Sequence, residues 1–84
     1  MQVKVYSTPS CPWCQATKNF LKANNIPFED IDVSQDEKAA MEMVMKSGQM
    51  GVPVIDIDNQ IVIGFNKPVL EELLGLNKND KKES

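Results

Sequence analysis

The two cysteines of this 84-residue chain lie three positions apart, in the sequence Cys-Pro-Trp-Cys, where a strand-like pattern gives way to a helix-like one. Residues 3–6 alternate in polarity as a half-buried strand does, and apolar residues recur at helical spacing over residues 12–23. Cys11 is therefore expected at the N-terminus of a helix, where free backbone N–H groups and the helix dipole stabilise a thiolate. Cys14 lies one turn further along the same face, so the two sulfurs can form a disulfide or stand together as a dithiol.

A redox pair is favoured over a structural or a metal-binding role for these cysteines. Pro12 and Trp13 between them argue against two residues that only fill a core. A closed zinc site needs about four ligands, and the chain offers two thiols and no histidine, so we expect no metal site within one chain. One alternative from a different class stays open: two copies could share zinc or an iron–sulfur cluster through their cysteines.

Length, charge and the lack of long apolar runs restrict the remaining classes of function. One domain is expected over residues 1–76, followed by a polar tail over residues 77–84. Nine lysines, no arginine and twelve acidic residues give a net charge of −3, which disfavours a nucleic-acid partner. Neither a membrane span nor a secretory signal is recognised, so we expect a cytoplasmic protein. We also expect it to be a monomer. Two cysteines in that reducing compartment favour catalysis over structure.

The segment after the cysteines is predicted to complete a strand–helix–strand unit. In its helix, Phe20 is assigned to the core and Lys18 to the outward face. Residues 28–33 are predicted as the second strand, with Asp30 and Asp32 as solvated charges on a solvent face. Because a helix joins the two strands, we expect them to pair in parallel.

A second helix is predicted from a capping-box pattern. Ser34 and Glu37 have the spacing at which each side chain satisfies a backbone N–H of the other residue, and Gly48 is the expected stop. The helix carries three methionines at alternating positions, of which at most half can be buried. We interpret them mainly as flexible core filling rather than as a binding surface. These methionines are Met41, Met43 and Met45.

The last third of the chain predicts a hairpin and a third helix. Residues 52–57 and 60–63 are rich in β-branched side chains and are joined by a two-residue Asp-Asn turn, which is typical of a β-hairpin. The helix that follows has Asn66 as its expected N-cap and Gly75 as its expected stop.

This order of elements, with Cys-Pro-Trp-Cys after the first strand and Val-Pro before the third, resembles the thioredoxin fold in its minimal, glutaredoxin-like form. The resemblance covers about residues 2–76. It implies an α/β domain of order βαβαββα, with a four-stranded mixed sheet and helices on both faces. It also implies that Cys11 is the exposed nucleophile, that Cys14 resolves the mixed disulfide, and that no bound cofactor is needed.

The same resemblance implies how a protein disulfide would dock. It places a cis-proline, here Pro53, beside the sulfurs, and it uses the backbone of the preceding Val52 to hold an extended substrate by strand addition. The other residues expected at the docking surface are Pro12, Trp13, Gly64 and Phe65.

The electron donor is predicted from departures within the family. Glutathione-using glutaredoxins typically have a lysine three residues before the first cysteine, a Thr-Val-Pro, and a Gly-Gly followed by acidic residues. Here these places hold Thr8, Gly51 before Val-Pro, and Gly64-Phe65 followed by Asn66-Lys67. The Gly-Phe pair resembles NrdH-type redoxins, which are reduced by a thioredoxin reductase. The resemblance thus implies a small dithiol electron carrier recharged by a flavoprotein reductase, with glutathione the less favoured donor.

Overall fold

The computed structural model describes residues 2–76, and its helices and strands follow one another in the predicted order. They are β1 (Val3–Ser7), α1 (Pro12–Ala23), β2 (Glu29–Asp32), α2 (Glu37–Ser47), β3 (Val54–Ile57), β4 (Gln60–Ile63) and α3 (Lys67–Leu74). The predicted tail at residues 77–84 lies outside the described residues.

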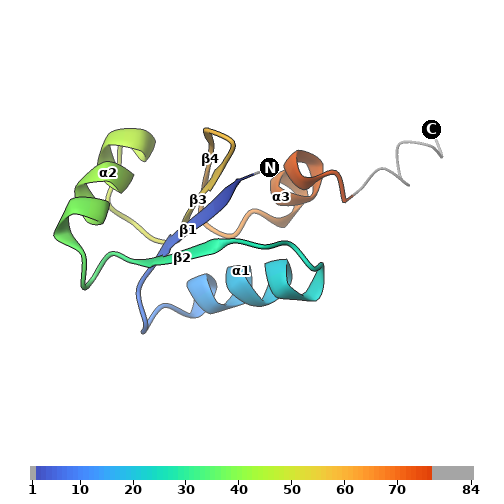
Figure 1. Cartoon of the computed structure of the whole chain (residues 1–84), viewed down its shortest axis with the longest axis horizontal. Coiled ribbons are helices and arrows are strands. Elements are labelled where there is room, and N and C mark those ends of the chain that lie inside the picture. The colour runs from blue at the N-terminus through green and yellow to red at the C-terminus, as the bar shows by residue number, and fades with distance from the viewer. Residues whose placement is uncertain (1, 77–84) are drawn as a thin grey trace.

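The strands form a single mixed sheet in the order β2-β1-β3-β4 (Figure 1). β1 is parallel to β2 and antiparallel to β3, and β3 and β4 form the antiparallel hairpin. Asp58 and Asn59 in the hairpin turn both have positive φ, of 49° and 74°, which matches the twist of a tight two-residue turn. The predicted α/β fold with a four-stranded mixed sheet is therefore confirmed.

Helices cover both faces of this sheet, and each face has its own core cluster. On one face, Leu21 of α1 and Leu70 and Leu74 of α3 pack with alternate residues of β1, β3 and β4. On the other face, Ala39 and Met43 of α2 pack with the remaining alternate residues. The period-2 alternation of the strands decides which face each side chain joins.

Helix α1 has the predicted start, but part of its predicted core face is wrong. Cys11 is its N-cap residue, and Pro12 occupies the first turn, where a missing N–H is not needed. Phe20 is only half-buried, although it packs against the core. Lys18 does not face outward: its side chain is 12% exposed and lies against β2.

The start of α2 differs from the predicted capping box. Asp36, not Ser34, is the N-cap, and its carboxylate accepts the Ala39 N–H at 3.1 Å. Ser34 is engaged elsewhere, because its hydroxyl and its N–H both donate to Asp32 at 2.6 and 2.9 Å. The helix therefore begins at Glu37, and it ends as predicted at Gly48, which has a φ of +75°.

Two further expectations about helices need correction. Only Met43 of the three α2 methionines fills the core, because Met41 and Met45 lie on the outer face and are exposed. Asn66 does stand at the N-cap position of α3, but its side chain makes no capping hydrogen bond. Gly75 ends α3 in the left-handed region, as predicted.

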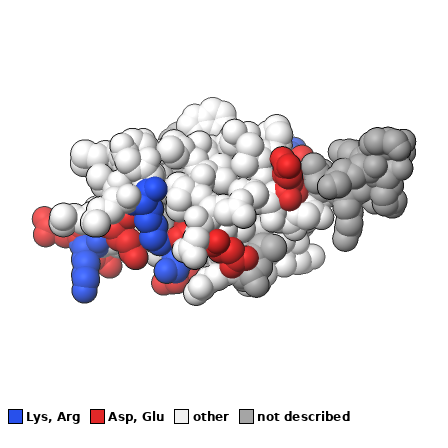
Figure 2. Space-filling view, turned by 90° about the horizontal axis from the view of Figure 1, so that it is seen from above, with Lys and Arg blue, Asp and Glu red and all other residues white. Residues whose placement is uncertain are grey.

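The charged residues of the described part of the chain are dispersed, and the carboxylate of Asp56 is buried. On the face shown in Figure 2, lysines at the α2 end lie among acidic side chains and do not form a separate basic patch. Asp56 of β3 is buried, and its carboxylate accepts a hydrogen bond from Lys46 of α2 at 2.7 Å. Within residues 2–76, no helix combines the length and the apolar character needed to cross a membrane.

Candidate active site

The topology brings three loops to one end of the sheet. β1 leads directly into the cysteine segment, and Tyr6 near its end pairs with Val54, the first residue of the antiparallel β3. Val54 in turn pairs with Ile63, the last residue of β4. The cysteines after β1, the Val-Pro before β3 and the Gly-Phe after β4 are therefore neighbours in space.

Cys11 is held at the mouth of α1 with its sulfur directed to the helix backbone. Its Sγ accepts the Cys14 N–H at 3.1 Å, which is the N-cap hydrogen bond of the helix. The same sulfur lies 4.0 Å from the Val52 carbonyl oxygen. The side chain is half-buried at the N-terminus of α1, so an incoming sulfur can reach it.

Cys14 is enclosed, and its environment keeps the thiol protonated. The residue is fully buried. Burial is the main cause that raises its pKa to about 11, and the hydrogen bond and charge of Cys11 act in the same direction. A hydrogen bond with the Thr8 backbone and the charge of Lys18 oppose this rise in pKa. The two thiols therefore differ in accessibility: an incoming molecule can reach Cys11, whereas Cys14 is shielded.

Beside the cysteines lies a shallow apolar groove with a volume of about 240 Å³. Its walls bring together five of the residues singled out from the sequence, namely Trp13, Val52, Pro53, Gly64 and Phe65. Trp13 is 64% exposed, and its ring centroid lies 6.3 Å from that of Phe65. Pro12 is exposed in the first turn of α1 but does not line this groove.

The backbone before β3 has a cis peptide bond and is tied to the loop after β4. The Val52–Pro53 bond is cis, as the resemblance implied. The Gly64 N–H donates to the Pro53 carbonyl at 2.8 Å and ties the two loops together, while Gly64 has a φ of +79°. Within residues 2–76, the Val52 N–H makes no backbone hydrogen bond. The Val52 carbonyl accepts the long contact from the Cys11 thiol described above.

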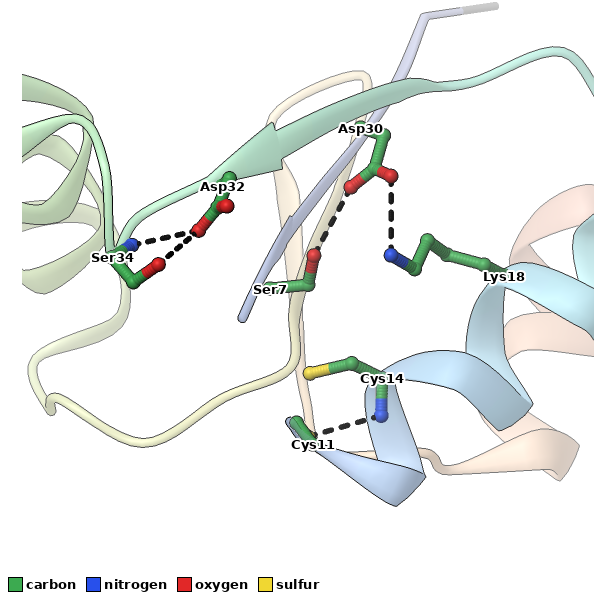
Figure 3. A network of polar contacts seen from close by, with 7 residues as sticks. All are labelled: Ser7, Cys11, Cys14, Lys18, Asp30, Asp32 and Ser34. Carbon is green, nitrogen blue, oxygen red and sulfur yellow. Dashed lines mark hydrogen bonds and ion pairs between the residues drawn. The ribbon is translucent and has the colours of Figure 1, made fainter. Parts of the chain in front are cut away.

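A polar network behind Cys14 was missed in the sequence (Figure 3). Asp30 of β2 accepts hydrogen bonds from the Ser7 hydroxyl at 3.0 Å and from the Lys18 ammonium at 3.1 Å. Asp30 is exposed, as predicted, but its ion pair with Lys18 and its hydrogen bond with Ser7 were not foreseen. The spacing of Cys14 and Lys18, four residues apart on one helix face, could have pointed to their proximity. The partner on β2 depends on the register that places Asp30 beside Val5.

The described residues do not form a metal centre of their own. Across residues 2–76, no three histidine, cysteine, aspartate or glutamate side chains are grouped so that they could hold a metal ion. Cys11 and Cys14 are two ligands, so a metal would need further ligands from outside this part of the chain.

Comparisons with known proteins point to one family. The family model of glutaredoxin matches residues 3–62. An uncharacterized glutaredoxin-like 8.6 kDa protein in the rubredoxin operon of Clostridium pasteurianum is 51% identical over 72 residues, which cover 86% of this chain and 96% of that protein.

Solved structures give the same result for the fold. The glutaredoxin of Archaeoglobus fulgidus superposes with a TM-score of 0.81 at 31% identity, over 87% of this chain and 85% of that one. The NrdH-redoxin of Escherichia coli, described as a glutaredoxin-like protein with a thioredoxin-like activity profile, has a TM-score of 0.77 at 26% identity, over 87% and 95%. With a match over most of its length in both sequence and structure, this chain belongs to the glutaredoxin family of the thioredoxin fold.

Proposed function

We propose that the protein is a thiol–disulfide oxidoreductase that reduces protein disulfides and carries electrons between a reductase and its substrates. The observation that carries this proposal is the asymmetry of the two thiols. Cys11 is accessible at a helix N-terminus and accepts a backbone N–H, whereas Cys14 is buried one turn away. A reachable nucleophilic sulfur beside a shielded thiol is the arrangement that two-step disulfide exchange requires.

In the first step the Cys11 thiolate attacks one sulfur of the substrate disulfide. A bond forms between Cys11 and that sulfur, the substrate S–S bond breaks, and the other substrate sulfur leaves as a thiolate that takes a proton from water. In the second step the Cys14 thiolate attacks the Cys11 sulfur and releases the second substrate thiolate. The substrate gains two electrons, and the protein is left with a Cys11–Cys14 disulfide.

The order of these steps follows from the environment of Cys14. In the dithiol, burial and Cys11 together raise the pKa of Cys14, so it stays a thiol and does not compete as the first nucleophile. Once Cys11 is bound in a mixed disulfide, its sulfur carries no charge and is a weaker acceptor for the Cys14 thiol. Both contributions of Cys11 to the raised pKa of Cys14 are then weakened, and Cys14 becomes easier to deprotonate in the step that needs it.

The groove supports docking of an extended substrate segment. The available N–H and carbonyl of Val52 can pair with a substrate backbone as an added strand. The exposed Trp13 and the half-buried Phe65 line the groove beside it, and aromatic side chains are enriched where proteins dock. In this proposal, Pro12, Pro53 and Gly64 shape the surface and make no side-chain hydrogen bonds with the substrate.

We further infer a flavoprotein reductase of the thioredoxin type as the main electron donor. A glutathione site would need a cation and carboxylates, and Thr8 and Lys67 stand where these are expected in glutathione users. The side chains that could substitute are engaged elsewhere: Lys67 lies over the Phe20 ring at 5.9 Å, and Gln49 bonds both backbone groups of Gly51. Each missing charge-assisted contact would weaken glutathione binding by about 1.5–3 kcal/mol.

A side-by-side assay tests both parts of the proposal. NADPH consumption is followed with a protein disulfide as acceptor, once with thioredoxin reductase and once with glutathione and glutathione reductase. We expect clear turnover with the first donor and at least about tenfold less with the second. Turnover only with glutathione would make the protein a glutathione-dependent dithiol glutaredoxin.

The same assay bears on the alternative of a shared metal site. No NADPH consumption with either donor, together with metal in the purified protein and a dimer on sizing, would replace the redox proposal by the metal-binding one. Metal analysis and sizing of the reduced protein also test the proposed monomer. The cytoplasmic location stays part of this proposal and is tested by fractionating cells that produce the protein.

A further inference from the structure

The buried sulfur of Cys14 has a lysine as its neighbour on the same helix face. Lys18 follows Cys14 by four residues on α1, and Figure 3 shows both side chains directed to the gap between α1 and the ends of β1 and β2. The Lys18 ammonium is fixed there by Asp30 at 3.1 Å, and Asp30 is fixed by the Ser7 hydroxyl at 3.0 Å. Ser7, Lys18 and Asp30 are called the Lys18 network below.

We propose that Lys18 is a positioning residue for the second step of the reaction: held by Asp30, its ammonium stabilises the Cys14 thiolate that attacks the mixed disulfide at Cys11. The inference rests on the proposed function and extends it to a residue outside the Cys-Pro-Trp-Cys motif.

The burial of the network makes the field of Lys18 effective at Cys14. A thiolate that is fully buried cannot be stabilised by water, so it depends on nearby dipoles and charges. The Lys18 side chain is 12% exposed, whereas that of Asp30 is 49% exposed. Water therefore screens the carboxylate more than the ammonium, and the net effect at Cys14 is that of a cation.

The other groups around Cys14 do not provide this charge. Of the charged side chains that act on Cys14 within the described residues, Cys11 opposes the Cys14 thiolate and Lys18 favours it. The Thr8 backbone also favours it, through a hydrogen bond. When Cys11 becomes part of the mixed disulfide, its opposing charge is lost, and the contributions of Lys18 and Thr8 remain.

A chromogenic aromatic disulfide separates the two steps in one stopped-flow experiment. The first coloured thiolate is released when Cys11 attacks the reagent, and the second is released when Cys14 displaces it from Cys11. The variants are Lys18→Gln, which keeps a hydrogen-bonding group for Asp30 but loses the charge, and Lys18→Arg, which keeps the charge. Lys22→Met is the matched control, because Lys22 lies one turn further along α1 and is exposed.

We expect Lys18→Gln to slow the second release and to leave the first nearly unchanged. For each unit by which the pKa of Cys14 rises, its thiolate fraction falls tenfold but the thiolate becomes more nucleophilic, so the second rate falls by about three- to fourfold per unit. The rate of the second release as a function of pH should move to higher pH in Lys18→Gln. It should return toward the original profile in Lys18→Arg and stay unchanged in Lys22→Met.

Thiolate absorbance in a Cys11→Ser background gives a second readout that requires no turnover. Lys18→Gln should raise the titration midpoint of Cys14 in this background, and Lys22→Met should not. Should Lys18→Gln fail to fold, Lys18→Met, which keeps most of the aliphatic stem, repeats both measurements. An unchanged second release and an unchanged midpoint in the uncharged variant overturn the inference. Loss of the first release in the unsubstituted protein would instead overturn the proposed function, so the two failures are distinguishable.

Discussion

Two lysine–carboxylate pairs lie on opposite faces of the sheet, and they bury opposite partners. On the α1 face the lysine of the Lys18–Asp30 pair is the shielded member, and the carboxylate is half-exposed. On the α2 face the carboxylate of the Lys46–Asp56 pair is 6% exposed and the lysine is 25% exposed. The two N–O distances are 3.1 and 2.7 Å. The same pair of residue types therefore leaves a cation inside the protein on one face and an anion on the other.

The neighbours of the two pairs explain why they have different roles. Both carboxylate oxygens of Asp56 accept a hydrogen bond, one from the Lys46 ammonium and one from the Asn59 N–H. Lys46 also donates to the Tyr6 hydroxyl. The charges of the Lys46–Asp56 pair are thus neutralised by each other and by these hydrogen bonds. We therefore infer that this pair contributes to the stability of the fold and not to the chemistry. Lys18 has a half-exposed partner and follows the buried Cys14 by one turn of α1, and we infer that its charge acts on that thiol.

The largest expected effect comes from removing the buried carboxylate of the second pair. Asp56→Ala leaves the Lys46 ammonium and the Asn59 N–H without their partner, and we expect it to lower the free energy of unfolding by about 3 kcal/mol. Glu42→Ala is the control, because Glu42 is exposed and lies 3.8 Å from the same ammonium. It should cost less than about 1 kcal/mol. Urea titration measures both, and equal losses would contradict the assignment.

A second expected effect is a loss of stability at alkaline pH. The pKa of Cys14 is raised from its ordinary 9.0 to about 11 by burial, so the folded protein keeps a proton that the unfolded chain releases. Stability should therefore fall as pH rises from 9 toward 11. The pKa of Lys46 is also raised, mainly by its hydrogen bond to Asp56, so that stabilisation is lost above its ordinary 10.5.

The Cys14→Ser variant separates the two contributions to this alkaline loss. Its free energy of unfolding should stay nearly level as pH passes 9 and should fall only where Lys46 titrates. Urea titrations at a series of alkaline pH values, on the reduced protein, give both curves. Parallel curves for the variant and the unsubstituted protein would show that Cys14 is not the group responsible.

The smallest effect on stability is expected for the first pair. Asp30→Ala removes a carboxylate that is half-exposed, so its loss should lower the free energy of unfolding by about 1 kcal/mol or less. This value lies well below the one expected for Asp56→Ala. A loss as large as that for Asp56→Ala would mean that the Lys18 network is chiefly a structural element, and the comparison of the two pairs would fail.

The order of elements and the position of the cysteines could be predicted because they depend on local patterns. Strand alternation, the helical stripe and the tight turn each involve residues close in the chain, and together they gave a topology that the structure has. The cis bond before Pro53 was implied only by the resemblance to the family, and the structure has it. The substrate-binding roles of Trp13, Val52 and Phe65 stay predictions.

The features that were missed depend on competition or on pairing across the sheet. Ser34 fits a capping box, but the nearby carboxylate of Asp32 captures both of its donors, so Asp36 caps the helix instead. Lys18 fits an outward helix position until the parallel register brings Asp30 within reach of its ammonium. The sequence pattern alone predicts neither the N-cap of α2 nor the position of the Lys18 side chain. Each depends on a residue on another element or outside the motif.

Trapping of the mixed disulfide shows which of the two cysteines is the nucleophile. The reduced Cys14→Ser variant is mixed with a peptide disulfide and analysed by mass spectrometry without a reductant, beside Cys11→Ser treated in the same way. We expect Cys14→Ser to accumulate a single adduct of half the peptide disulfide, located at Cys11, and Cys11→Ser to give no adduct and no peptide reduction. An adduct in Cys11→Ser, or disulfide reduction by that variant at the rate of the unsubstituted protein, would contradict the assignment of Cys11 as the nucleophile and Cys14 as the resolving thiol.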